Sequence, residues 1–389
     1  MAERKQPPQD VYALRRIKKR KRLLKRIGLF ALISTLLLAV YVNRDFLMSK
    51  LRDLTRRHHS VQSNGSLSGG NFPLSVYGGI SYQSDTISDL LLILGDAYLY
   101  LYQTNGELLE SRQHAYGSAM LQAAGDYALV YENGGTRFRL ETENQTLYEK
   151  TISDKIIFGR VSEDGYTALV TTSDTSACKL IVFDRKGKQI YLRSCVKELV
   201  EIAFTKDSGG CYAVSIHTDN GVMKSVVHSY DFQSEKERWV SQPLDMLCIS
   251  VYNTDGGEVF VLGDVSCSYL DAGGAVLSTY VYPDTLVRGD YADGIAAILL
   301  RNDEKRTNTV AMLGGAAAAP VLLDFDTEVK DVAVSDHSVT VQTRAKLETW
   351  TIAGQLLAES EIADTYDSFL PVDSYLFLMG YNRIDRLEY

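Results

Sequence analysis

Hydrophobic positions divide the chain into two parts with different patterns. Residues 27–42 (IGLFALISTLLLAVYV) form one uncharged run, whereas from residue 71 onward short runs rich in Val, Ile, Leu, Tyr and Thr alternate with Gly, Asp, Asn and Ser. A long uncharged run is typical of a membrane-spanning helix, and short apolar runs between turn residues are typical of β-strands. The pattern therefore predicts one transmembrane helix followed by an all-β domain over residues 71–389.

The residues before the apolar run predict its orientation. Residues 1–26 contain eleven Lys and Arg residues against Glu3 and Asp10. Because cytoplasmic segments retain positive charge, we expect residues 1–26 to be a basic cytoplasmic segment, residues 27–42 to be a single-pass signal-anchor in the cell membrane, and the rest of the chain to be extracellular. A cleaved signal peptide and a buried core helix are the alternatives. No A-x-A-like site follows the run, and a core helix would not follow so many cations.

Two short segments separate the predicted helix from the all-β domain. Residues 43–59 keep apolar residues at helical spacing and are predicted to be a helical stalk. Residues 60–70 (SVQSNGSLSGG) are rich in Ser and Gly, which is typical of a flexible linker. We therefore expect the all-β domain to be tethered outside the membrane.

A repeat of about forty residues organises the all-β domain. A short turn with an aspartate recurs between two strand-like runs, and the intervals between successive aspartates are 41, 38, 43, 48, 38, 43 and 37 residues. Self-similarity at this period indicates a repeat architecture. The eight predicted turns are Ser84-Asp85, Gly125-Asp126, Asp164-Gly165, Asp207-Ser208, Asp255-Gly256, Asp293-Gly294, Asp336-His337 and Asp373-Ser374.

Each repeat can be laid out as four antiparallel strands, which is the pattern of a propeller blade. The seventh repeat is the clearest, with strands predicted over 330–334, 339–343, 347–352 and 356–359. The eighth repeat has residues for three strands, and residues 72–76 can supply its fourth strand and close the ring. Since blades stacked round an axis cover each other's apolar faces, we predict an eight-bladed β-propeller. Seven blades and a pair of β-sandwiches are the alternatives.

Two phrases carry a resemblance to known propellers. Residues 161–170 (VSEDGYTALV) are similar to the S-x-D-G-x-x-[AL]-x-[VL] phrase of WD40-like and TolB-like blades, although the Trp-Asp dipeptide of true WD40 repeats is absent. Together with the basic N-terminus, the single span and the linker, residues 99–114 (LYLYQTNGELLESRQH) resemble an uncharacterised family of membrane-anchored propellers from Gram-positive, mostly clostridial, bacteria. This resemblance covers nearly the whole chain. It implies the fold and the anchor, and it implies no functional residue.

Charge separates the two parts and argues against nucleic acid as a partner. Residues 1–57 carry 16 Lys and Arg against 4 Asp and Glu, a balance of +12. The remainder then holds 25 basic and 45 acidic residues, a balance of −20, and the two balances sum to the formal net charge of −8. An acidic domain lacks the basic surface that binds phosphate groups.

Five cysteines occur, and two of them are predicted to face each other. With a two-residue turn at Lys186-Gly187, paired residues sum to 373, which places Cys178 opposite Cys195 on neighbouring strands. A disulfide between them would be permitted outside the cell, and two free thiols are the alternative. Because the number of cysteines is odd, at least one thiol stays unpaired in a monomer.

No local motif predicts catalysis, a metal or a cofactor. The sequence contains no G-x-S-x-G, H-E-x-x-H, P-loop, G-x-G-x-x-G or C-x-x-C motif, and no D-x-D-x-D-G calcium loop. His114, His217, His228 and His337 are expected on separate blades, as surface or packed residues. The repeated aspartates are interpreted as turn residues rather than ligands.

These observations support two function hypotheses from different classes. A ring on a tether, without a catalytic motif, favours a non-enzymatic binding or assembly platform for a protein, peptide or cell-wall ligand near the membrane. The alternative is an extracytoplasmic hydrolase or lyase whose site is formed by propeller-face loops far apart in sequence. A sensor that relays ligand binding through the span is a third hypothesis. The partner, the functional face and the oligomeric state do not follow from the sequence.

Overall fold

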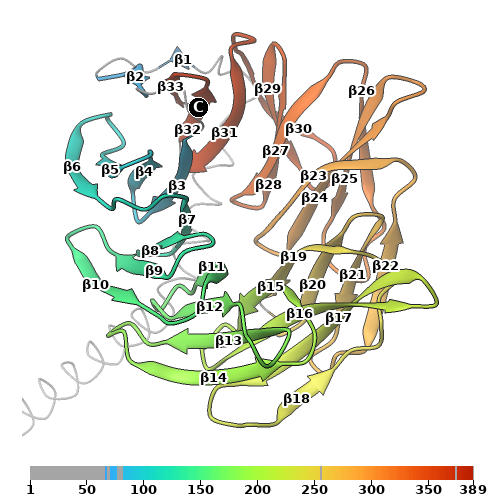
Figure 1. Cartoon of the computed structure of the whole chain (residues 1–389). Helices are drawn as coiled ribbons and strands as arrows, with labels where there is room; N and C mark the ends of the chain where they lie inside the picture. The colour runs from blue at the N-terminus through green and yellow to red at the C-terminus, as the bar shows by residue number, and fades with distance from the viewer. Residues whose placement is uncertain (1–65, 68–70, 77–81, 255, 373–374, 389) are drawn as a thin grey trace, which may run out of the picture. The chain divides into compact units, whose positions relative to one another are not determined.

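Eight antiparallel sheets make up the part of the chain that the structure describes. The structure is a computed structural model, and it describes residues 66–67, 71–76, 82–254, 256–372 and 375–388. These residues contain 33 β-strands and no helix. The sheets follow one another in chain order round a ring, as Figure 1 shows. The prediction of an all-β, eight-bladed propeller with four-stranded blades is confirmed, and seven blades is wrong.

Each of the first seven blades consists of four consecutive strands. Blades 1 to 4 comprise β3 (Gln83–Ile87), β4 (Leu90–Leu94), β5 (Tyr98–Tyr102) and β6 (Leu108–Gln113); β7 (Ala119–Ala124), β8 (Tyr127–Glu132), β9 (Arg137–Glu141) and β10 (Thr146–Thr151); β11 (Ile156–Val161), β12 (Thr167–Thr171), β13 (Cys178–Phe183) and β14 (Gln189–Cys195); and β15 (Leu199–Phe204), β16 (Gly210–Asp219), β17 (Val222–Asp231) and β18 (Glu237–Val240).

The remaining blades continue the same order, and the last one is completed from the other end of the chain. Blades 5 to 7 comprise β19 (Cys248–Asn253), β20 (Val259–Gly263), β21 (Ser266–Leu270) and β22 (Val276–Val281); β23 (Thr285–Ala292), β24 (Ile295–Asn302), β25 (Thr307–Leu313) and β26 (Val321–Phe325); and β27 (Val329–Ser335), β28 (Ser338–Thr343), β29 (Lys346–Thr351) and β30 (Leu356–Glu361). Blade 8 comprises β31 (Tyr366–Val372), β32 (Tyr375–Gly380) and β33 (Arg383–Glu388) with β1 (Ser66–Leu67) and β2 (Leu74–Ser75).

Blade 8 closes the ring by strand pairing between distant parts of the chain. Leu74 pairs with Ile384 and Ser75 with Arg383, so β2 lies antiparallel to β33 as the predicted outer strand. β1, also of two residues, pairs with the same edge of β33. Inside the closure, Leu74 and Ile384 are buried with residues of blades 1 and 8. The predicted fourth strand over 72–76 is therefore present, and its regular part is Leu74–Ser75.

The hydrophobic core lies between the blades. Each of eight clusters of buried side chains draws on two neighbouring blades, and together they cover every blade interface of the ring. In β24, Ala297 and Leu299 pack toward blade 7, whereas Ala296 and Ile298 pack toward blade 5. Because alternate residues point to opposite faces of a sheet and both faces are covered, such strands are apolar throughout.

Strand direction gives the ring two faces, which we name by what they carry. Successive strands of a blade run antiparallel. The connectors between blades and the turns between second and third strands therefore lie on one face, the connector face. The turns between first and second strands and between third and fourth strands lie on the opposite face, the turn face. First strands contact the first strands of the next blade, as β3 does with β7 and β23 with β27.

The aspartate turns link neighbouring blades on the turn face. The Ser88 hydroxyl donates to Asp126 at 2.6 Å, and the Ser208 hydroxyl donates to Asp164 at 2.9 Å. The predicted turn at Ser84-Asp85 is wrong, because Asp85 lies inside β3 and the turn is at Ser88-Asp89. Five other predicted turns lie between first and second strands. Asp255 and the pair at 373–374 lie outside the described residues.

Half-buried carboxylates tie the first strands of neighbouring blades together. Asp85 accepts the Ala123 backbone N–H at 3.0 Å, and Asp290 accepts the Val334 backbone N–H at 2.7 Å. Burial raises the pKa of Asp85 to about 6 despite its backbone hydrogen bonds, and burial also raises the pKa of Asp290. These side chains hold the inner ring together at the cost of desolvating charge.

The predicted N-terminal segments lie outside the described residues. Residues 1–26, 27–42 and 43–59 are not described, and only 66–67 of the predicted linker are. Within the described residues, no helix has the length and hydropathy needed to cross a membrane. The transmembrane helix, the stalk and the linker therefore stay predictions.

Candidate functional site

A cavity of about 500 Å³ opens on the turn face where the first strands of blades 2 to 6 end. Its wall combines small, aromatic and polar side chains, among them Ala203, Phe204, Tyr252, Asn253 and Thr254. Thr254 is 8% exposed, and its hydroxyl has no hydrogen-bond partner among the described residues. A cavity of this size with a few polar groups has the character of a small-ligand or side-chain pocket.

An ion pair between two blades holds Arg160 in the wall of this cavity. The Arg160 guanidinium binds both carboxylate oxygens of Glu201, with Nε to Oε1 at 2.7 Å and Nη2 to Oε2 at 2.5 Å. Glu201 also accepts the backbone N–H of Ile202 at 2.8 Å. Burial raises the pKa of the neighbouring Tyr252 to about 12, so its hydroxyl is neutral at physiological pH. Because Arg160 and Glu201 pair with each other, this wall of the cavity is polar but carries no unpaired charge.

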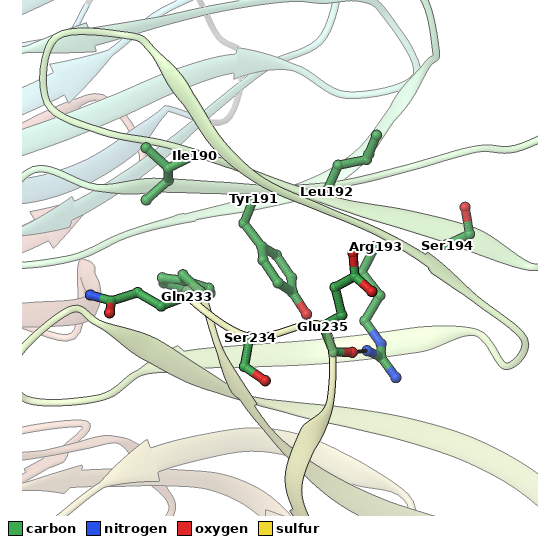
Figure 2. Close-up of a pocket in the computed structure, with 9 residues that line it drawn as sticks. Ile190, Tyr191, Leu192, Arg193, Ser194, Gln233, Ser234 and Glu235 are labelled. Carbon is green, nitrogen blue, oxygen red and sulfur yellow. Dashed lines mark hydrogen bonds between the residues drawn. The ribbon is translucent and has the colours of Figure 1, made fainter.

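A second hollow of about 420 Å³ lies at the outer rim between blades 3 and 4. In Figure 2, Tyr191 and Arg193 extend from β14 toward the turn that carries Ser234 and Glu235. Arg193 donates to the Glu235 carbonyl at 2.9 Å and to the Glu237 carboxylate at 2.6 Å. Tyr191 is only 9% exposed, so most of its ring belongs to the blade interface. In this hollow the Arg193 guanidinium is already engaged by Glu235 and Glu237.

A serine, a histidine and a glutamate are aligned across blade 4. The Ser215 hydroxyl lies 2.8 Å from His228 Nε2, and His228 Nδ1 lies 3.5 Å from Glu237 Oε1. Burial lowers the pKa of His228, which favours the neutral imidazole. This order of groups resembles the relay of serine hydrolases. Ser215 is only 1% exposed, however, so a substrate carbonyl cannot reach its hydroxyl, and the relay serves as a buried link between strands.

The histidines are less dispersed than the sequence suggested. His217 and His228 lie on the paired strands β16 and β17 of one blade, so the expectation of separate blades is wrong for these two. His114 accepts the Tyr116 N–H at Nδ1 and contacts the Gly95 carbonyl through Nε2. His337 sits in a turn on blade 7. No group of three or more His, Cys, Asp or Glu residues in the described part of the chain could hold a metal ion.

The phrase at 99–114 that carries the family resemblance forms a structural network. Arg112 of β6 reaches across to blade 2, where its Nη1 lies 2.8 Å from a Glu141 oxygen. Arg139 Nε lies 2.6 Å from the other Glu141 oxygen. Glu141 is fully buried, and Arg112 and Arg139 are almost so. These residues join blades 1 and 2 through buried, paired charges. The arginine in the phrase at 99–114 therefore has a structural role, and its presence is not evidence of a ligand.

Cys178 and Cys195 are paired across β13 and β14, as the sequence arithmetic predicts. The turn differs from the prediction: Gly187 donates to Asp184 and Asp184 donates to Lys188, which is one residue longer than a two-residue turn. A bulge at Ile190 restores the register. Both thiols are buried and free, and their mutual hydrogen bond lowers the pKa of Cys178 and raises that of Cys195. The disulfide itself stays a prediction.

Large apolar side chains are exposed on the connector face of blades 3 to 6. Three of them are the extra residues of bulges at the start of first strands. The others lie in a connector, in the turn between β20 and β21, or at the first two residues of β17. Exposed side chains of this size are informative when they gather on one face of a domain. The connector-face apolar set comprises Ile157, Val196, Val222, Met223, Ile249, Val265 and Val287.

A long hairpin from blade 4 contributes two members of this set. Strands β16 and β17 are each 10 residues long, and their paired register continues to Asp219 and Val222. The turn at Asn220-Gly221 has positive φ at both residues, which suits a tight hairpin turn. Val222 is 56% exposed and Met223 46% exposed at its tip. The hairpin therefore presents apolar side chains beyond the blade.

The fold and these surfaces define an eight-bladed β-propeller whose described residues hold no accessible catalytic constellation. The chain belongs to a family of unknown function (DUF5711), whose profile matches residues 81–388. This confirms that the chain is a member of a family without an assigned activity. No described residue bears on the predicted membrane anchor or bacterial origin of that family.

Comparison with solved structures shows the same fold in proteins of very different sequence. BamB from Moraxella catarrhalis superposes with a TM-score of 0.57 at 7% identity, covering 84% of this chain and 100% of that chain. Sqt1 from Saccharomyces cerevisiae superposes with a TM-score of 0.57 at 11% identity, covering 84% of this chain and 99% of that chain. No curated protein sequence matches. At such identities the likeness establishes the fold alone.

Proposed function

We propose that the protein is a membrane-anchored, extracellular β-propeller that serves as a non-enzymatic platform for a protein, peptide or cell-wall ligand. The observation that carries this proposal is the connector-face apolar set, because exposed apolar side chains grouped on one face are typical of interaction sites. Val196 is 92% exposed and Val265 50% exposed in this set. The fold shared with BamB and Sqt1 is consistent with an interaction scaffold.

The anchor supports a role close to the membrane. Residues 27–42 have the composition of a transmembrane helix, and the basic residues before them favour a cytoplasmic N-terminus. The propeller would then be displayed outside the cell. Protease treatment of intact cells tests this placement: the propeller is expected to be released only if it lies outside, and a fully protected propeller would contradict the proposal.

Site-specific photocrosslinking tests which face binds. A photoreactive residue at Val196 or Val265 is expected to crosslink a partner in intact cells, whereas the same residue at Glu107 or Asp271 on the turn face is not. The double variant Val196→Asp and Val265→Asp is expected to abolish the crosslinks made from Val222, because charge on the apolar set opposes its burial. Equal crosslinking from the two faces would contradict this assignment.

The alternative of a hydrolase or lyase has less support. Its strongest feature is the alignment of Ser215, His228 and Glu237, and the serine is buried. Labelling with a fluorophosphonate probe separates the two hypotheses. Modification of Ser215 in the folded protein would favour the hydrolase, and its absence favours the platform.

A further inference from the structure

The outer strand of blade 5 differs from the other outer strands in charge. β22 has the sequence VLSTYV and carries no charged side chain. Each of the other outer strands of blades 1 to 7 carries at least one, as β18 does with Glu237 and Arg238. Charged residues on an edge strand prevent it from pairing with another chain. Among the described outer strands of these seven blades, β22 alone lacks this protection.

The free edge of β22 is also apolar and open. β22 is the last strand of its sheet and is bonded only to β21. Leu277 is 48% exposed and Val281 68% exposed. Tyr282 donates its backbone N–H to Val265 at 3.0 Å, so it points into the sheet. Since successive residues of a strand point their backbone groups to alternate sides, those of Val281 and Thr279 point to the open edge.

The strand is complementary to itself in the antiparallel direction. Leu277, Thr279 and Val281 are all exposed. Thr279 and Val281 alternate in the regular part of β22, and Leu277 is the extra residue of a bulge at its start. If Thr279 faces the same residue of a second chain, Leu277 faces Val281 of that chain, and the reverse contact follows by symmetry. Cross-strand pairs of apolar residues and of threonines stabilise a sheet. The same pairing at β30 would place Glu359 of one chain opposite Glu359 of the other, where like charges repel.

We propose that β22 is a dimerisation edge, at which two copies of this chain pair antiparallel around Thr279 to form one continuous sheet with two-fold symmetry. The occupant is a second copy because the edge matches itself in apolar character and in register, which a two-fold interface requires. A six-residue edge buries less area than a standard protein interface, so the dimer is expected to dissociate on dilution. One end of this edge adjoins the connector-face apolar set, since the Val265 carbonyl accepts the Tyr282 N–H and Val281 pairs with Ser266, whereas the two-fold position at Thr279 lies further along β22.

Charge substitution at the two-fold position tests the proposal. The purified full chain in a non-ionic detergent is examined by sedimentation equilibrium, where the monomer mass is 43.3 kDa. We expect a concentration-dependent dimer that Thr279→Lys abolishes, because two lysines would face each other. Thr279→Glu is expected to be monomeric as well. Mixing the two variants in equal amounts is expected to restore the dimer, which also shows that both variants are folded.

Disulfide trapping adds a test of the register. Thr279→Cys is expected to give a crosslinked dimer under mild oxidation, because the facing Cα atoms of a hydrogen-bonded antiparallel pair lie about 5.5 Å apart, within the range that a disulfide spans. The matched control is Glu359→Cys at the equivalent position of β30, whose side chain is 40% exposed and which is expected to remain monomeric. A chain that stays monomeric at about 100 µM, the range of weak association, would overturn the proposal, as would equal crosslinking of the two variants.

Discussion

Asp290 in β23 accepts a hydrogen bond of 2.7 Å from the backbone N–H of Val334, which lies 44 residues later and one blade further round the ring. Asp85 makes the equivalent contact with Ala123, 38 residues later. In both cases a side chain from one blade satisfies the first strand of the next. The inner ring therefore depends on polar contacts between blades as well as on the apolar clusters that lie outside it.

Removing one of these contacts is expected to destabilise the ring locally. Asp290→Ala leaves the Val334 N–H, in a residue 5% exposed, without its side-chain partner. An unsatisfied buried donor costs about 1–3 kcal/mol in the free energy of unfolding. Hydrogen exchange at the Val334 amide is expected to accelerate accordingly. Asp326→Ala, in an exposed connector, is the matched control, and an equal effect there would count against this role for Asp290.

The buried aspartates are expected to give the protein a pH-dependent stability. The pKa of Asp85 in the folded protein is raised from 3.8 to about 6. The folded state therefore binds more protons than the unfolded state between these values, so this contribution is fully present below about 3.8 and is lost as pH rises through about 6. The free energy of unfolding of the unmodified protein minus that of Asp85→Asn is expected to fall by about 2–3 kcal/mol from pH 4 to pH 7.

Denaturant unfolding at several pH values checks this expectation. Asp331, whose pKa burial also raises to about 6 although Arg288 opposes the shift, should behave like Asp85. Asp89→Asn, in the exposed turn beside β3, serves as the control and should leave the pH dependence unchanged. The expectation would be contradicted if the free energy of unfolding of the unmodified protein, minus that of Asp85→Asn, increased as pH rises.

The charge network between blades 1 and 2 is expected to be the most sensitive polar site in the fold. Glu141→Gln removes the buried charge that faces both guanidinium groups, which leaves Arg139 opposite a neutral side chain and Arg112 with Glu110 as its charged partner. Breaking a buried ion pair from one side costs about 3–5 kcal/mol. Thermal or denaturant unfolding should show a loss of this order. The exposed Glu143 offers the control, since Glu143→Gln retains the backbone carbonyl that Arg112 contacts.

In an oxidising environment Cys178 and Cys195 are expected to form a disulfide, because they are register partners on adjacent strands. Alkylation of the unfolded protein without reduction, followed by mass spectrometry, should leave these two cysteines unmodified and the other three alkylated. Closing a loop of this size is expected to stabilise the fold by about 3 kcal/mol. Alkylation of all five cysteines in protein isolated from the cell surface would contradict the expectation.

The architecture was predictable because the sequence of the domain repeats with a period of about forty residues. Turn residues and apolar runs recur at a period that only a blade explains, so the number of blades and the strand that closes the ring followed from counting. The pairing of Cys178 with Cys195 was right although the turn was one residue longer than predicted, because the bulge at Ile190 compensates for it. The predicted turn at Ser84-Asp85 was wrong because the dipeptide Ser-Asp by itself does not distinguish a turn from the interior of a strand.

The polar networks could not be predicted in the same way. Ser215, His228 and Glu237 come from three strands, and their alignment depends on the register of each pair and on a bulge between β17 and β18. Arg112 and Glu141 come from different blades. The spacing of these residues along the chain does not predict such contacts. The same holds for the connector-face apolar set, because exposure depends on which residues of a connector the neighbouring blade leaves uncovered.

Pairing of β2 with β33 has a consequence for how the domain is made. During synthesis the residues of β2 leave the ribosome before any blade, and their partner strand is the final one to emerge. The seven sheets of blades 1 to 7 can assemble in order before the strands β31 to β33 of blade 8 have been made, and until then the outward sides of blades 1 and 7 are uncovered. Completion of the circle is thus a late, single event that joins the earliest and latest segments of the domain, and an interrupted chain would expose the apolar sides of blades 1 and 7.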